Sequence, residues 1–169
     1  MPAVLGLSLL LSAAAVPADP VRPADPFDGL AFLVGDWTAS AGGGQPGQAT
    51  AGSFSFVREL AGKVLVRRNH AEYASRPDEK ERVVHDDLMV VYAAPPGLRA
   101  VYFDNEGHVI HYTVAVAPGQ ATFESEPGPG PRFKLVYERR GEGEVAATFS
   151  IAPPGKPHQL YVSGTARRR

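Results

Sequence analysis

Histidine and aspartate side chains gather in two places in this chain, and these residue types can exchange protons or bind cations. The first place is the run His85, Asp86 and Asp87. On a β-strand His85 and Asp87 would share one face, where a carboxylate–imidazole pair could perform acid–base chemistry or bind a cation. The same run is also typical of the polar, solvent-facing side of a strand. Both interpretations stay open at this stage.

The second place holds His108 and His111, which are three residues apart. Residues at that spacing on a strand point to opposite faces, so the two imidazoles cannot bind one metal ion together. We therefore predict no metal site and expect His108 to lie near Asp104 in a hairpin. His111 would then lie on a mixed face that could border either solvent or a cavity.

The motifs of several enzyme classes are missing from the sequence. The chain has no cysteine, which excludes disulfides and thiolate catalysis. It also lacks the G-x-S-x-G, H-E-x-x-H and phosphate-loop patterns. Lys and Arg total 17 against 18 Asp and Glu, so no basic excess favours nucleic-acid binding. We expect a non-enzymatic protein that does not bind nucleic acid.

The N-terminal residues have the pattern of a targeting signal. An apolar run of about 13 residues, too short to cross a bilayer, is followed by small residues. We predict a signal peptide over residues 1–18, cleaved after Ala18 or Ala15, and a proline-rich linker over 19–26. The remaining residues, 27–169, form one domain. The mature protein is then periplasmic or secreted, without stable membrane insertion, and the sequence leaves its oligomeric state open.

The rest of the chain alternates short strand patterns with glycine- and proline-rich turns. After a helical turn at 28–34, these patterns predict nine to ten strands without crossover helices. Short connections imply antiparallel neighbours, and closure removes the sheet edges. We predict an all-β fold, an antiparallel up-and-down barrel, with a two-sheet sandwich as the alternative. The predicted strands span residues 36–41, 52–60, 63–74, 83–93, 98–104, 108–116, 121–126, 132–139, 144–152 and 160–166.

One hairpin can be predicted in detail. Residues 104–107 match a type I turn with Gly107 in the left-handed conformation. Tyr102 then lies opposite Ile110, and Ala100 lies opposite Tyr112. On the predicted strand 63–74, Arg67 and Asn69 share a face, which either points to water or gives the barrel a polar floor or an anion site. The interior candidates are Phe54, Phe56, Tyr102, Ile110, Tyr112, Phe123, Tyr137 and Phe149.

A short helix followed by Gly35-Asp36-Trp37 and a strand meander resembles the calycin superfamily, which contains the lipocalins. The phrase FLVGDWTASAGG also resembles bacterial calycin-like domains of unknown function. The resemblance implies that Gly35 and Trp37 help to close the barrel. It also implies that Arg167 or Arg168 packs on the Trp37 ring by a cation–π contact.

Nitrobindin-like haem-binding barrels are a second resemblance, because they also have ten strands and an early G-x-W. That resemblance implies haem as a cofactor and His158 as its axial ligand. Our leading hypothesis is nevertheless an exported barrel that binds a small hydrophobic ligand without any cofactor. A completely filled barrel, acting as a structural or interaction module, is the third possibility. The ligand-binding candidates are Phe54, Phe56, Arg67, Asn69, Tyr102, Ile110, His111 and Tyr112.

Overall fold

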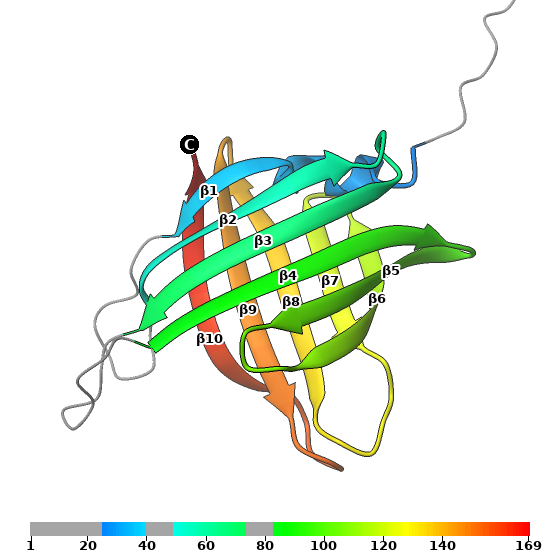
Figure 1. Ribbon diagram of the computed structural model, residues 1–169, viewed down its shortest axis with the longest axis vertical. Coiled ribbons are helices and arrows are strands. Elements are labelled where there is room, and N and C mark those ends of the chain that lie inside the picture. The colour runs from blue at the N-terminus through cyan, green and yellow to red at the C-terminus, as the bar shows by residue number, and fades with distance from the viewer. Residues whose placement is uncertain (1–24, 40–48, 74–82) are drawn as a thin grey trace, which may run out of the picture.

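The computed structural model describes residues 25–39, 49–73 and 83–169 (Figure 1). The predicted signal peptide, 1–18, and most of the predicted linker, 19–26, lie outside these ranges. The described residues form one short 3₁₀ helix and ten strands. These are η1 (Asp28–Leu33), β1 (Gly35–Ala39), β2 (Ala49–Glu59), β3 (Val64–Tyr73), β4 (Val83–Ala94), β5 (Gly97–Asp104), β6 (Val109–Ala117), β7 (Gln120–Ser125), β8 (Arg132–Gly141), β9 (Glu144–Ala152) and β10 (Gln159–Arg168).

The ten strands form one closed antiparallel barrel. Each strand pairs with its neighbours in the sequence, and β1 closes the ring by pairing with β10. This confirms the predicted up-and-down barrel and rules out the two-sheet sandwich. Because every strand has a partner on both sides, the described barrel has no free sheet edge.

The hairpin between β5 and β6 has the predicted register. Tyr102 pairs with Ile110, and Ala100 pairs with Tyr112. Gly107 has a φ of +91°, a left-handed conformation that glycine adopts without a steric penalty. The Gly107 N–H donates to the Asp104 carbonyl at 3.2 Å. The alternation along these strands therefore places the Tyr102 side chain inside the barrel.

The two ends of the barrel differ (Figure 1). Helix η1 covers one end, which we call the capped end, and buries Leu30 and Leu33 completely. The opposite end, which we call the far end, carries the connections after β5, β7 and β9. Between the two ends lies a core whose aromatic rings meet mostly edge to face, and which fills the capped half of the barrel. Its largest members are Trp37, Phe54, Phe56, Tyr112, Phe123 and Tyr137.

The seam between β1 and β10 is held by Trp37 and Arg168, which are cross-strand partners. The Arg168 guanidinium lies 4.6 Å from the centre of the Trp37 ring and donates to the carbonyls of Phe32, at 3.0 Å, and Val34. Gly35 makes room for it, because a Cβ there would come within 2.6 Å of Arg168 Nη1. The closing residue is therefore Arg168.

Arg167, the alternative closing residue, lies on the outer face of β10. Its side chain is exposed and donates to Glu144 at 3.2 Å. The parity of the strand explains the difference, because successive side chains point to opposite faces and only Arg168 pairs with Trp37.

We expect Arg168→Ala to lower the free energy of unfolding by about 2 kcal/mol, because it removes a cation–π contact and two hydrogen bonds to backbone carbonyls. Urea unfolding followed by the fluorescence of Trp37, the single tryptophan, measures this change. Arg167→Ala is the matched control and should cost less than about 0.5 kcal/mol. Equal losses in the two variants would show that the seam does not depend on Arg168.

Candidate functional site

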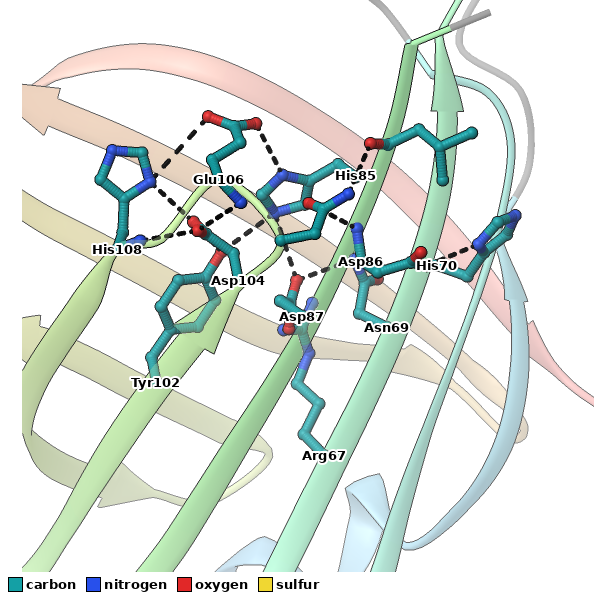
Figure 2. Close-up of polar contacts among 12 residues, drawn as sticks. Arg67, Asn69, His70, His85, Asp86, Asp87, Tyr102, Asp104, Glu106 and His108 are labelled. Atoms are coloured by element: carbon teal, nitrogen blue, oxygen red, sulfur yellow. Dashed lines mark hydrogen bonds and ion pairs between the residues drawn. The ribbon is translucent and has the colours of Figure 1, made fainter.

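A cluster of polar side chains lies inside the far end of the barrel (Figure 2). It comes from inward-facing positions on three adjacent strands, where the apolar pattern of the core stops. Strand β3 supplies Arg67 and Asn69, strand β4 supplies His85 and Asp87, and strand β5 supplies Tyr102 and Asp104. The pairing of Asn69 with Asp87, and of Asp87 with Asp104, brings the three strands' contributions together.

The floor of this cluster is a buried ion pair between Arg67 and Asp87. Their side chains are only 8% and 3% exposed. Arg67 Nη1 donates to Asp87 Oδ1, and Asn69 Nδ2 donates to the other carboxylate oxygen at 2.9 Å. Burial, the largest single influence, disfavours the guanidinium charge, but Asp87, Tyr137 and Tyr102 together outweigh it, so the pKa of Arg67 is raised. Arg67 therefore stays charged inside the barrel.

Such a pair is costly to keep inside a barrel. Removing each ion from water costs several kcal/mol, and apolar side chains of similar volume often give equal or greater stability. Arg67 Nε is also buried without a hydrogen-bond partner among the described residues. A costly charged pair at one end of an otherwise aromatic interior is a common mark of a functional site.

The hydrogen bonds around Asp104 determine which groups donate and which accept in the series of hydrogen bonds from Asp104 through Tyr102 to His85. The Asp104 carboxylate accepts from the backbone N–H groups of Glu106, at 3.0 Å, and His108, at 2.9 Å. It also accepts from His108 Nδ1 at 2.8 Å and from the Tyr102 hydroxyl at 3.2 Å. Although burial opposes ionisation, these donors lower the pKa of Asp104. The ionised Asp104 can only accept, so the single Tyr102 hydroxyl hydrogen points to it.

His85 must therefore donate from both of its ring nitrogens. Its Nε2 lies 2.9 Å from the Tyr102 oxygen, whose hydrogen is already committed to Asp104. Its Nδ1 lies 3.1 Å from a Glu106 carboxylate oxygen, which can only accept. Asp87 Oδ2 lies 3.5 Å from His85 Nε2. Asp87 is the main cause of the rise in the pKa of His85 to about 9, Glu106 adds to that rise, and burial opposes it. His85 is an imidazolium at neutral pH.

The far half of the interior is less tightly covered than the capped half. Its inward-facing side chains are half-buried, whereas the core near η1 is fully buried. Solvent therefore reaches the interior at the far end, above the Arg67–Asp87 floor. The half-buried interior side chains are Asn69, Tyr73, Tyr102, Ile110, Phe133, Leu135 and Phe149.

Aromatic rings line the side of the far end opposite the polar cluster. Phe133 and Phe149 stack with centroids 6.0 Å apart and planes 8° apart. Tyr161, which is 70% exposed, meets Phe149 edge-on at 6.2 Å and extends these rings towards solvent. Burial raises the pKa of Tyr73, and the nearby Tyr161, Asp87 and Glu106 side chains raise it further, against the opposing influence of Arg67. Tyr73 therefore lies within electrostatic range of both sides, and the far end presents a polar wall and an aromatic wall.

The predicted ligand-binding residues divide into three groups. Arg67, Asn69, Tyr102 and Ile110 face the interior at or near the far end. Phe54, Phe56 and Tyr112 are buried in the packed core and fill the barrel. His111, whose face the sequence left open between solvent and a cavity, is exposed on the outer face of β6 and so does not belong to the interior site.

The site also contains residues that the sequence did not assign to it. His85 and Asp87 could have faced either water or the interior, and Glu106 was not a candidate. The pattern that could have placed His85 and Asp87 inside is their position on β4, where every second residue lies on the same face. Met89 and Val91 continue that face and are fully buried. Once those apolar residues are placed inside, alternation places His85 and Asp87 inside too.

Two depressions lie outside the barrel interior. One, of about 590 Å³, lies along β1–β5 and is lined by outward-facing residues such as Ser55, Arg68 and Asp86. Three residues of the polar cluster, Asn69, Asp87 and Asp104, also border it. The other, of about 370 Å³, lies beside the capped end around Arg139 and Arg168. The charged side chains on the outer face are exposed, whereas Arg67 and Asp87 inside the barrel are buried. We therefore place the candidate site inside the barrel.

His158, the predicted axial ligand, lies in the connection between β9 and β10 at the far end. Its Nε2 is buried and has no hydrogen-bond partner among the described residues. An orphaned imidazole nitrogen is the donor that haem iron needs, so the chemistry of His158 fits that group. Elsewhere in the described ranges, no group of three or more His, Asp or Glu side chains is placed to hold a metal ion.

Fold and site together define a ten-stranded antiparallel β-barrel with one packed half and one solvent-accessible, polar-and-aromatic half. No protein-family model matches the chain, and no curated protein matches it. The crystal structure of Rv2717c from M. tuberculosis is similar, with a TM-score of 0.59 and 14% sequence identity over 86% of this chain and 98% of that chain. At this identity the similarity shows a shared barrel fold and nothing finer. None of the described helices is long and apolar enough to cross a membrane.

The charge on His85 predicts how stability depends on pH. Its pKa is about 9 in the folded protein against 6.5 for an unperturbed histidine, so its stabilisation is complete below pH 6.5 and is lost as pH rises to 9. Over that interval we expect the free energy of unfolding of the wild type to fall by on the order of 2 kcal/mol, and we expect His85→Gln to lack this fall. Urea unfolding at several pH values measures it.

His70, whose pKa is also raised by its bond to Asp86, is present in both proteins and so cancels in the comparison. His111→Gln, exposed on β6, is the control and should keep the wild-type slope. An identical slope in His85→Gln would show that His85 is not an imidazolium held by its neighbours.

Proposed function

We propose that this protein binds a small, largely apolar organic molecule inside the far end of its barrel and performs no catalysis on it. The observation that supports the proposal is the contrast between the two halves of the interior. The capped half is filled by aromatic side chains, whereas the inward-facing residues of the far half remain half-buried around a buried ion pair. Mostly apolar walls with a few oriented polar groups are typical of small-molecule sites.

The roles of the residues follow from their positions. The aromatic wall of Phe133, Phe149 and Tyr161 offers ring faces and edges against which an apolar ligand can pack. Arg67, Asn69 and Asp87 form a polar floor beneath the ligand. Ion-pair and hydrogen-bond partners hold these side chains in place before any ligand arrives, which reduces the entropy lost on binding.

Filling the far half should abolish binding. We expect Ile110→Trp to lower the affinity for the neutral fluorescent probe N-phenyl-1-naphthylamine at least about tenfold, because the larger side chain takes the probe's space. Titration of probe fluorescence against the full chain measures it. His111→Trp, the next residue on the same strand but on its outer face, is the matched control and should bind as wild type does.

A wild-type protein that does not bind the probe, or equal binding by both variants, would contradict an interior site. The first of these outcomes would favour the filled barrel that acts as a structural or interaction module.

A haem-binding barrel is the second candidate function, and the buried, unpartnered Nε2 of His158 is the observation that favours it. Haem, when bound, would supply redox chemistry and small-ligand binding at iron, and His158 would hold it by that nitrogen. The described interior shows no second histidine without partners, since both nitrogens of His85 are engaged.

Titration with haemin separates the two candidates. If the protein is a haem-binding barrel, haemin produces a sharp Soret band in the wild type that His158→Ala loses and His111→Ala keeps. A broad, unchanged haemin spectrum in all three proteins would exclude axial ligation by His158.

The proposal extends to where the protein acts. The signal pattern in residues 1–18 supports export to the periplasm or secretion, where the mature chain would take up its ligand. The mass of the exported chain reports this directly, because cleavage after Ala18 leaves Asp19 as the first residue.

A further inference from the structure

We propose that the ligand carries a carboxylate, and that this carboxylate binds the Nδ1–H of His85 in the position that Glu106 occupies in the structure. The inference rests on the proposed function, because it names the chemical class of molecule that the same site binds. Figure 2 shows Glu106 above the His85 ring, at the rim of the barrel.

The two N–H groups of His85 have partners of opposite character. Nε2 points to Tyr102 and towards Asp87, whose side chain is 3% exposed and already bonded to Arg67 and Asn69. That inner partner cannot leave without exposing a buried charge. Nδ1 points to Glu106, whose side chain is 56% exposed. The Glu106 carboxylate can therefore be replaced, whereas the His85 imidazolium is held in place by its inner partners.

The turn does not need the Glu106 carboxylate to keep its shape. The backbone N–H of Glu106 is held by Asp104, and the backbone N–H of Asn105 donates to the Asp86 carbonyl at 3.0 Å. The Asn105 side chain donates to the Val84 carbonyl at 3.0 Å. Exposed ion pairs contribute little to stability, so an incoming anion displaces Glu106 at small cost.

The charges of the site select a singly charged anion. Asp87 neutralises Arg67, and His108, whose Nδ1 lies 3.9 Å from Glu106, already pairs with Asp104 at 2.8 Å. Among the described residues that contact Glu106, His85 is therefore the one whose N–H a ligand carboxylate can take over. A dianion would bring a second negative charge close to Asp87 and Asp104 without a partner, and a cation would meet the imidazolium. Glu106 itself shows that a carboxylate oxygen fits at 3.1 Å from Nδ1.

The aromatic wall supplies the other half of the ligand. Tyr73 lies within electrostatic range of both Glu106 and Tyr161, and the Tyr161 ring meets Phe149 edge-on at 6.2 Å. A planar, apolar body attached to a carboxylate can reach both walls at once. The structure therefore favours aromatic or otherwise apolar monocarboxylates.

The test compares 2-naphthoate with 2-naphthamide, which has the same shape without the charge, by calorimetric titration of the full chain. We expect the wild type to bind the naphthoate more tightly than the amide. Glu106→Ala should raise the affinity for the naphthoate on the order of tenfold and leave the amide unchanged, because a charge-assisted competitor is removed. His85→Gln should abolish the preference, also when combined with Glu106→Ala.

Glu126→Ala is the matched control, since Glu126 lies at the same end but pairs with Arg99 and does not contact His85. It should leave both affinities unchanged. Glu106→Gln, which keeps the side-chain volume, repeats the test if the alanine variant does not fold.

An equal gain in Glu126→Ala, or no gain in either Glu106 variant, overturns the carboxylate proposal. Continued binding of N-phenyl-1-naphthylamine by the wild type would then leave the proposed function standing. If the wild type bound none of the three probes, the proposed function itself would be refuted.

Discussion

Closure of the barrel between β1 and β10 is the constraint on which the rest of the structure depends. The two strands share three residue pairs, and one of them joins Trp37 to Arg168. Beyond the strand, the backbone N–H of Arg169 also donates to the Asp36 carbonyl at 2.9 Å. If this seam opened, β1 and β10 would become free edges, and η1 would lose the arginine that holds its last carbonyls. The orientation of each interior side chain follows from this closed ring.

The closed ring creates an interior that has to be filled, and the two halves fill it differently. Near η1, rings packed edge to face take up the space and bury large apolar areas. Arg67 lies at the boundary, with its guanidinium 6.0 Å from the Tyr137 ring and bonded to Asp87. Hydrophobic packing therefore ends at a charge. The stability of the capped half allows the far half to hold costly polar groups.

Local patterns in the sequence predicted much of this fold. Turn residues such as Gly107 and alternating apolar residues placed all ten strands within a few residues of their observed limits. The register of β5 and β6 followed from one turn, because a three-residue connection fixes which residues pair and places Tyr102 opposite Ile110. Such signals lie within a few residues of each other, so a single sequence contains them.

The facing of polar strands could not be predicted in the same way. Arg67 and Asn69 look like solvent-facing residues on β3 alone, and they are stable inside because Asp87 on the neighbouring strand bonds to both. A partner on another strand is invisible to the pattern of one strand. Similarly, the choice between Arg167 and Arg168 depended on which of them pairs with Trp37, a contact between the two ends of the domain.

The charges at the far end alternate in sign from the interior to the rim: Arg67, Asp87, His85 and then Glu106. Each contacts the one before it, and exposure rises from the buried Arg67–Asp87 pair through His85, which is 23% exposed, to the Glu106 carboxylate, which is 56% exposed. An event at the rim therefore changes the charge that His85 balances, and His85 in turn contacts the carboxylate that neutralises Arg67. The buried ion pair and the exposed turn form one electrostatic unit, so the polar floor of the barrel responds to what binds at its rim.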